Sequence, residues 1–339
     1  MSLAQLKKEF NETLLSFAWR QWGQMGVSAH VSKADSWTVD PEALLLFSIE
    51  IGRLEARMFD EIMDWCIRNS RLINIQRLRN LAKRDPYYPV VLLSSIVETV
   101  RRYSGNRAWK AIKPDRVAST GTRPLFMSSE EPESLPVQRR DPIFDSYGFV
   151  RSPYVPSKKS VPHLARAPFN LDFKLRGIFG ISSRAEIIRY LLLRKGAEAN
   201  AAAIADAAGF AKRNIIESLN DLASAGVVRV RNQGNEKIYS LPVDDWLSLL
   251  GICNSDIPDW VAWPSLFRAL SMIFSWLIKP ETLSLSPYLL SSGARSLIRE
   301  IRPDLTAANF NITDDSRFLG EAYFPVFAAD IKNVLAELK

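Results

Sequence analysis

Residues 209–226 read GFAKRNIIESLNDLASAG, and this stretch decides how the chain is interpreted. A glycine stands at each end, as is typical of a turn before a helix and of a helix stop. Between the glycines, Ile215, Leu219 and Leu222 recur at i, i+4 and i+7, which places them on one face of a helix. The stretch therefore predicts a short amphipathic helix with its apolar stripe against a core.

The opposite face of this helix carries charges of both signs. At about 100° per residue, Arg213, Glu217 and Asn220 lie opposite the apolar stripe, and Lys212 and Asn214 flank the helix start. Glu217 follows Arg213 by four residues, the spacing of a helical ion pair. Two interpretations follow: a helix that lies in a DNA groove, or a packed helix with a charged outer face.

The neighbouring segments extend the pattern. Residues 183–186 have the Ser-x-x-Glu spacing of a capping box, which predicts a helix start. Asn200 is a candidate N-cap for an alanine-rich helix over 201–208. After Gly226, the run VVRVR (227–231), a turn in NQGNE and the run KIYSL (237–241) predict a β-hairpin with basic flanks.

The stretch AIADAAGFAKRNIIESLNDLASAGVVRV (203–230), followed by GNEKIYSL, resembles the winged-helix domains of bacterial transcriptional regulators of the MarR and ArsR kind. The resemblance covers residues 174–243 only. It implies a winged helix-turn-helix in which the second helix of the pair enters the major groove and the hairpin touches backbone or minor groove.

The resemblance also assigns roles to the candidate DNA-binding residues. In the helix, Arg213 and Asn220 stand where base edges are read, whereas Lys212 and Asn214 stand where phosphates are bound. The central Glu217 opposes phosphate unless it accepts a hydrogen bond from cytosine. In the hairpin, the expected contacts with the DNA backbone are Arg229, Arg231 and Lys237. Asn235 is expected near the hairpin tip.

Periodicity along the whole chain predicts a mainly α protein in four segments. A helical domain occupies 1–113 and a proline-rich linker or arm occupies 114–170, which holds nine of the 19 prolines. The winged helix-turn-helix with its small β-hairpin occupies 171–243, and a helical C-terminal domain occupies 244–339.

Single residues refine this division. Asp40, followed by proline and glutamate, has the features of a helix N-terminus. Three aromatic residues in the arm, Tyr147, Phe149 and Tyr154, indicate that part of it packs on a surface. The tryptophans beyond residue 244 are either core residues or the lining of an effector pocket.

The chain carries a formal net charge of +7, which permits a polyanionic partner without requiring one. Residues 35–67 hold eight acids against two bases, and residues 68–116 hold twelve bases against three acids. The basic block is either a second nucleic-acid surface or a helix face that compensates the acidic helices before it. Its interleaved aromatic residues are Tyr87, Tyr88, Tyr103 and Trp109.

The sequence gives little indication of catalysis, metal binding or cofactor binding, and we expect none of the three. It contains no G-x-G-x-x-G, P-loop or G-x-S-x-G motif, and His30 and His163 lie far apart. We interpret Asp60, Glu61 and Asp64 as the exposed face of a helix. The prediction is therefore that the protein is not an enzyme.

Cysteine content and hydropathy bear on location. Cys66 and Cys253 lie in apolar helical contexts and are predicted to be buried free thiols in a reducing compartment. No run approaches the length of a membrane span, and the amphipathic N-terminus lacks the apolar core of a signal peptide. We therefore expect a cytoplasmic protein.

These features favour a DNA-binding transcriptional regulator. The expected partner is double-stranded DNA, read by a homodimer on a near-palindrome, with the flanking helical domains serving dimerisation, sensing or partner binding. The alternative is a protein-interaction or antitoxin-like module in which the winged helix is auxiliary. The large N-terminal helical region motivates this alternative.

Overall fold

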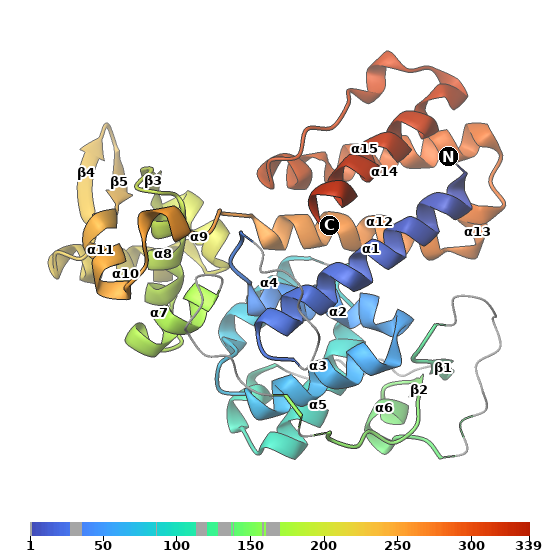
Figure 1. The fold of residues 1–339 in the computed structure, drawn as a ribbon, viewed down its shortest axis with the longest axis horizontal. Helices are drawn as coiled ribbons and strands as arrows, with labels where there is room; N and C mark the ends of the chain where they lie inside the picture. Colours follow the sequence, from blue (N-terminus) through green and yellow to red (C-terminus); the bar gives the residue numbers. More distant parts are fainter. Residues whose placement is uncertain are drawn as a thin grey trace.

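The computed structural model describes residues 2–27, 36–85, 87–112, 121–127, 137, 139–157, 159–160 and 170–339. Within these ranges the chain is mainly helical, as predicted, with a few short strands (Figure 1). His30 and His163 lie outside the described residues.

The helices before residue 260 are α1 (Leu3–Gln24), α2 (Pro41–Ile51), α3 (Ala56–Arg68), α4 (Ile75–Arg84), α5 (Val90–Ser104), α6 (Pro142–Ser146), α7 (Leu171–Phe179), α8 (Ser183–Leu193), α9 (Ala201–Ala208), α10 (Lys212–Ser224) and α11 (Val243–Leu250). Those after it are α12 (Trp263–Ile278), α13 (Pro280–Leu283), α14 (Pro287–Ala307) and α15 (Tyr323–Glu337). Short 3₁₀ helices are η1 (Gly52–Leu54), η2 (Arg107–Ala111), η4 (Asn254–Asp256), η5 (Asp315–Arg317) and η6 (Gly320–Ala322). The strands are β1 (Arg123–Pro124), β2 (Phe149–Val150), β3 (Ala199–Asn200), β4 (Arg229–Gln233) and β5 (Glu236–Ser240).

Buried apolar side chains of the described residues form two clusters. The larger one joins α1–α6 to α12–α15, so helices from the predicted segments 1–113 and 244–339 share one core. The smaller one runs from Leu171 to Ile257 and includes Trp246 and Leu250 of α11. We call these two parts the large body and the small body. The predicted segment boundaries remain predictions.

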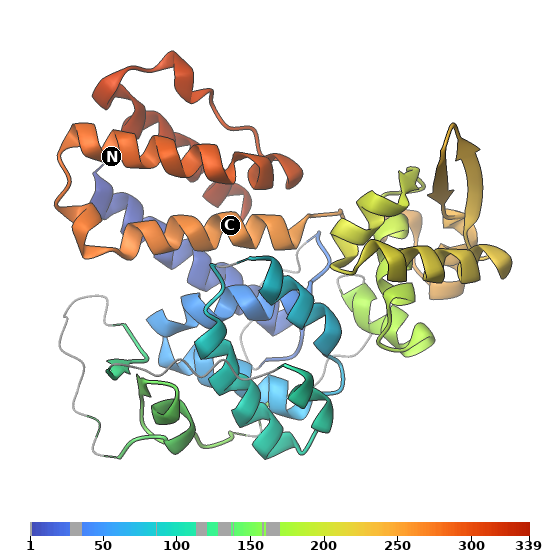
Figure 2. The ribbon, with the colours of Figure 1, turned by 180° about the vertical axis from the view of Figure 1, so that it is seen from behind.

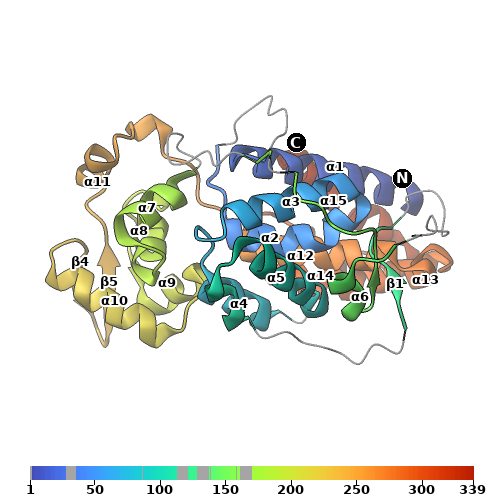
Figure 3. The same ribbon diagram turned by 90° about the horizontal axis from the view of Figure 1, so that it is seen from below.

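The two bodies lie along the long axis of the molecule, and the small body occupies one end (Figures 1 and 3). The hairpin of β4 and β5 projects from that end, as the view from behind also shows (Figure 2). Aromatic packing ties the large body together: the Phe47 and Phe267 rings stack at 4.5 Å, and Trp22 meets Trp65 edge-on at 5.4 Å. Such residues bury large apolar areas, so both ends of the chain contribute to one core.

The aromatic residues of the proline-rich arm pack as predicted. Tyr147, Phe149 and Tyr154 are buried members of the large cluster. The described part of the arm forms α6 and a parallel pair of two-residue strands, in which Arg123 is opposite Phe149.

The acidic residues of α3 hold this arm, so the prediction of an exposed acidic face is wrong for Asp64. Its side chain is buried and accepts hydrogen bonds from the Tyr154 hydroxyl and, at 2.7 Å, from the Ser157 backbone N–H. Asp60 accepts two bonds from the Arg151 guanidinium at 2.7 and 2.9 Å. The sequence pattern does not reveal these contacts, because the partners Arg151 and Tyr154 lie about ninety residues after Asp60 and Asp64.

The small body contains the local elements that the sequence predicts. Asn200 caps α9 by accepting from the Ala203 N–H at 2.9 Å. In α10, Ile215 and Leu219 are fully buried and Leu222 nearly so. Strand β5 pairs antiparallel with both β3 and β4, which gives the sheet order β3-β5-β4, and Gly234 and Asn235 form the turn between β4 and β5.

Two local predictions are wrong. The Ser183–Glu186 capping box does not form: Ser182 precedes α8 without a side-chain cap, and Glu186 turns into a buried group of arginines. Cys66 is buried, as expected, but Cys253 is exposed in the loop after α11. The residues around Cys253 in the sequence are apolar, but α11 ends at Leu250, so Cys253 lies in the following loop and not on the buried side of a helix.

Candidate nucleic-acid interface

The exposed face of α10 is the first part of the candidate interface. Lys212, Arg213, Glu217 and Asn220 are all exposed, whereas Asn214 is half-buried at the start of the helix. The apolar stripe fixes this orientation because it packs on α8 and α9. The structure therefore brings Arg213, Glu217 and Asn220 together on one outward face, whereas Lys212 is exposed at the helix start and Asn214 lies at the edge of the face.

An intramolecular ion pair occupies the centre of this face. Arg213 Nε donates to Glu217 Oε1 at 3.1 Å, and the two side chains are 88% and 63% exposed. The predicted i, i+4 pair is thus confirmed. A pair this exposed contributes only about 0.3–0.5 kcal/mol, so an external anion can displace Glu217 from Arg213.

The hairpin is the second part of the candidate interface, and Arg229, Arg231, Asn235 and Lys237 are all exposed on it. Arg231 is already engaged: its Nε donates to Glu198 Oε1 at 2.6 Å. Within the described residues, the side chains of Arg229 and Lys237 form no hydrogen bond or ion pair. Their charges are free to attract an external anion.

Strand register divides these basic residues between two faces of the hairpin. Arg229 and Arg231 are two residues apart on β4 and therefore point to the same face. Lys237 is opposite Asn232, so it points to the other face. A flat partner surface cannot contact Arg229, Arg231 and Lys237 at once. All three can be contacted when the hairpin inserts between two segments of a partner's backbone, one on each face.

Helix α4 fixes the position of α10 from the large body. Its side chains Arg77, Asn80 and Arg84 donate to the backbone carbonyls of residues 208, 209 and 210 at 2.9, 3.1 and 3.2 Å. Those carbonyls belong to the turn between α9 and α10, where the negative end of the α9 dipole favours cations. These members of the basic block 68–116 therefore act within the molecule, and two of its aromatic residues, Tyr88 and Trp109, are buried.

Gly209, the first residue of the stretch 209–226, is needed at this contact for two reasons. Its φ of 72° is the left-handed conformation that caps α9. A Cβ there would also lie 3.2 Å from Leu81 Cδ2 and 3.3 Å from Arg77 Cγ. Gly226, which closes the same stretch, has a similar φ of 71° but no neighbour within 4 Å of such an atom.

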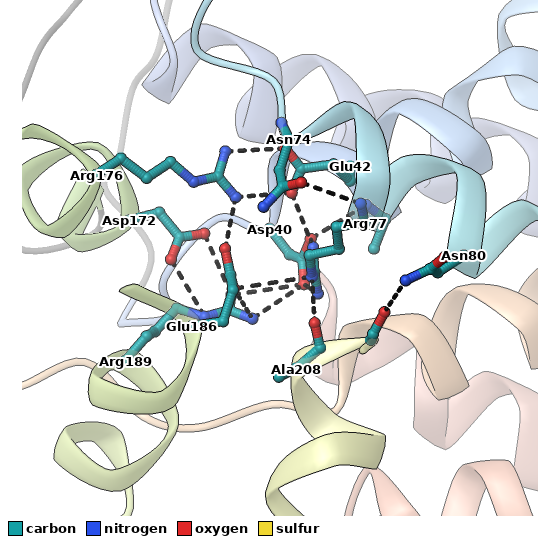
Figure 4. A network of polar contacts seen from close by, with 12 residues as sticks. Asp40, Glu42, Asn74, Arg77, Asn80, Asp172, Arg176, Glu186, Arg189 and Ala208 are labelled. Atoms are coloured by element: carbon teal, nitrogen blue, oxygen red, sulfur yellow. Dashed lines mark hydrogen bonds and ion pairs between the residues drawn. The ribbon is translucent and has the colours of Figure 1, made fainter. Parts of the chain in front are cut away.

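A buried group of charged residues joins the two bodies beside this turn (Figure 4). We call it the junction cluster. The large body contributes acids at the start of α2 and an arginine of α4, and the small body contributes residues of α7 and α8. All are at most 5% exposed, and the members are Asp40, Glu42, Arg77, Asp172, Arg176, Glu186 and Arg189.

The arginines of the junction cluster each bridge carboxylates. Arg77 donates to Asp40 at 2.5 and 2.6 Å and to Glu42 at 2.9 Å. Arg176 Nη2 donates to Glu42 at 2.7 Å and to Glu186 at 2.8 Å, so it links α2 to α8. Multiply bonded guanidinium groups of this kind are among the strongest polar contacts in proteins.

The remaining arginine pairs within the small body and beyond it. Arg189 Nε lies 3.1 Å from Asp172 Oδ1, and its Nη2 lies 3.2 Å from Glu186 and 3.4 Å from Asp40. The sequence alone indicated none of these bridges. The sequence predicts a helix start at Asp40 and Glu42, and Asp40 does cap α2 by accepting from the Ala43 N–H at 3.1 Å.

The junction cluster holds four carboxyl groups and three guanidinium groups, so one carboxyl group lacks a matching cation. Burial, with the nearby Glu186 carboxylate, raises the pKa of Asp172 to about 7, although Arg189 opposes the shift. For Asp40, the two arginines Arg77 and Arg189 outweigh burial and hold the pKa below its ordinary value. A proton on Asp172 therefore balances the buried charge near neutral pH.

Neither a membrane-spanning element nor a metal site is found among the described residues: no helix there is long and apolar enough to cross a bilayer, and no three potential metal ligands gather. Comparisons of the chain with protein-family models, curated proteins and solved structures found no match. We therefore infer function from the candidate interface itself.

Proposed function

We propose that the protein is a DNA-binding transcriptional regulator in which α8, α9, α10 and the sheet β3-β5-β4 act as a winged helix-turn-helix. The order helix, short strand, helix, helix, hairpin supports this proposal. In it, α10 lies in the major groove of double-stranded DNA and the hairpin follows the backbone.

The observation that carries the proposal is the set of exposed polar side chains on α10 and on the hairpin of the small body. Lys212, Arg229 and Lys237 have no partner among the described residues, and Arg213 is held only by an exposed ion pair. Residues 212–240 hold five basic and three acidic side chains, so the excess of positive charge is modest. Such a surface fits a binder whose affinity depends on a few phosphate contacts.

The proposal gives each group a role. Lys212, Arg229 and Lys237 bind phosphates, and Arg213 and Asn220 read base edges once Arg213 leaves Glu217. Arg231 remains bound to Glu198, the residue before β3, and supports the middle of the hairpin.

Fluorescence anisotropy with a labelled duplex from the region upstream of its gene, and with a random duplex of the same length, tests the proposal. The slope of log affinity against log salt concentration should fall by about 0.9 for each phosphate contact removed, so Lys237→Ala and Arg229→Ala should each flatten it by that amount. Lys279→Ala removes an exposed lysine of the large body and should leave the slope unchanged.

Arg213→Ala tests base reading separately. It should weaken binding to the specific duplex by about 1–3 kcal/mol and reduce the preference over the random duplex. A binding constant that does not respond to salt, or one that is unchanged in a Lys212→Ala/Arg213→Ala double variant, would refute the proposal.

Homodimerisation and a cytoplasmic location belong to the same proposal. A dimer would place two copies of α10 about 34 Å apart, one DNA turn, on a near-palindromic site. Sedimentation of the protein alone and with a duplex of two half-sites measures the stoichiometry directly.

A second candidate function, a protein-interaction or antitoxin-like module, is favoured by exposed apolar side chains on the small body. Ile178, Ile181 and Leu249 are 51%, 42% and 67% exposed, and the adjoining Phe179 and Trp246 rings lie 5.7 Å apart. Co-purification from native cells tests this candidate, and the absence of any stoichiometric partner argues against it.

A further inference from the structure

A cavity of about 340 Å³ lies between the two bodies, next to the junction cluster. Its volume is within the range of small-molecule sites in proteins. The cavity, which we call the junction cavity, is lined from both bodies, by residues that include Asp85, Tyr88, Tyr190, Trp260, Arg268 and Asp304.

The lining of the junction cavity includes a buried carboxylate oxygen that accepts no hydrogen bond from the described residues. Asp85 is 4% exposed, and while its Oδ1 accepts from the Tyr87 N–H at 2.9 Å, its Oδ2 accepts no hydrogen bond. Tyr88 and Tyr190, which also line the cavity, are 5% and 7% exposed as whole residues. A buried carboxylate oxygen without a hydrogen-bond partner is rare, so Asp85 Oδ2 points to a ligand that donates a hydrogen bond.

The charge around Asp85 favours a cation. Asp85 and Asp304 face a single guanidinium group there, that of Arg268, whose Nη2 also lies 3.6 Å from Glu300. The nearest Arg268 atom to Asp85 Oδ2 is Nε at 3.6 Å, beyond hydrogen-bond distance. Burial raises the pKa of both Asp85 and Asp304, as expected where carboxylates lack sufficient positive charge.

The other charged residues of the lining are closer to charge balance. Arg84 pairs with Asp206 at 3.4 Å, and exposed Arg194 lies over the Tyr190 ring at 5.8 Å, where water screens its charge. Tyr190 and Trp260 meet edge-on at 5.0 Å and form an aromatic wall. Trp260 is thus one tryptophan beyond residue 244 that lines a pocket, whereas Trp263 is core.

We propose that the junction cavity binds a small organic ammonium compound. Its ammonium group donates to Asp85 Oδ2 and its apolar body lies against Tyr190 and Trp260. A bound molecule would bridge α4, α12 and α14 of the large body to α8 and α9 of the small body. A resulting change in DNA affinity rests on the proposed function, whereas the binding itself does not.

Isothermal titration calorimetry of the full chain without DNA tests the site, with three probes of similar size and different charge. We expect 2-phenylethylammonium to bind with a Kd of about 1 mM or tighter. The isosteric neutral 2-phenylethanol and the anionic 3-phenylpropionate should bind at least about tenfold more weakly, because neither supplies a charged donor to Asp85.

Two variants and one control locate the binding. Asp85→Asn should weaken binding of 2-phenylethylammonium about tenfold or more and bring its affinity close to that of 2-phenylethanol. Ala207→Trp fills the cavity from α9 and should abolish binding of all three probes, with circular dichroism reporting that the fold persists. Asp244→Asn removes an exposed acid of α11 and should bind as the unmodified chain does.

Equal affinity for the three probes, no measurable ammonium binding, or undiminished binding in the folded Ala207→Trp variant would each overturn the site. DNA affinity is then measured with and without saturating 2-phenylethylammonium. An unchanged DNA affinity overturns the coupling alone. A chain that binds the probe and no DNA supports the cavity and overturns the proposed function, so the two failures are distinguishable.

Discussion

Replacing Arg77 with methionine removes the guanidinium group that connects the large body to the α9–α10 turn. The side chain is fully buried and donates to Asp40, to Glu42 and to the Ala208 carbonyl. Methionine fills a similar volume, so the change removes charge and hydrogen bonds more than it removes packing.

The size of the effect follows from what stays behind. Four carboxyl groups would then face two guanidinium groups in a site that water does not reach. Breaking a buried ion pair by removing one partner typically costs about 3–5 kcal/mol, because the other partner remains buried without compensation. That is a large fraction of the 5–15 kcal/mol by which most domains are stable.

Urea unfolding followed by circular dichroism measures this loss, and amide hydrogen exchange locates it. We expect the free energy of unfolding of Arg77→Met to fall by about 3–5 kcal/mol, with faster exchange at the end of α9 and the start of α10. Lys83→Met changes an exposed residue of the same helix and should stay within about 0.5 kcal/mol of the unmodified chain.

Arg77→Lys tests geometry separately from charge. A single ammonium group cannot reach two carboxylates and a carbonyl in the same directions, so the loss should be intermediate. A loss below about 1 kcal/mol in Arg77→Met, or protection of α9 and α10 equal to that in Lys83→Met, would show that the junction cluster does not join the bodies as described.

Three further predictions concern pH, backbone conformation and DNA affinity. Burial raises the pKa of Asp172 to about 7, whereas the unfolded value is near 4, so the folded state binds the extra proton and this group lowers the free energy of unfolding by about 2–3 kcal/mol as pH rises from 5 to 8. Asp172→Asn should remove that slope in urea titrations at pH 5, 6, 7 and 8, and an unaltered slope contradicts the assignment. Gly226→Ala should lower the free energy of unfolding by about 1 kcal/mol because residue 226 has a positive φ. Gly209→Ala should lower it by about 1–3 kcal/mol more, because the added Cβ also meets side chains of α4. Equal losses of stability in thermal unfolding would exclude this crowding. Under the proposed function, Glu217→Gln frees Arg213 and removes a charge that repels phosphate. DNA affinity measured by anisotropy should therefore rise, with a steeper salt dependence. Weaker binding would indicate instead that Glu217 accepts a hydrogen bond from a cytosine.

The candidate interface was predictable from the sequence to the extent that it depends on short-range pattern. The stripe of Ile215, Leu219 and Leu222 decides which side of α10 is buried, and hence that Arg213 and Asn220 face outward. The hairpin follows from alternation and a glycine turn. The pairing of Arg231 with Glu198 did not follow, because the partners are 33 residues apart and meet only when β3 joins the sheet.

Charged residues were the hardest to interpret, since sequence does not show whether a charge is solvated or buried. Asp40 and Glu42 have the spacing of a helix start, and Ser183 and Glu186 have the spacing of a capping box. The first pair does begin a helix, yet both its acids are buried in ion pairs with Arg77. The second pair forms no cap because Glu186 is bound by arginines instead.

The sequence by itself determined the helical content, the amphipathic helix 212–224 and the hairpin, because each depends on residues within one or two turns of each other. Only the tertiary structure decided that both ends of the chain share one core, that α4 holds the α9–α10 turn, and that seven charged residues meet between the bodies. Helical period and turn preference act locally along the backbone. Burial of an ion pair depends instead on which distant segments exclude water together, and that is a property of the packed chain alone.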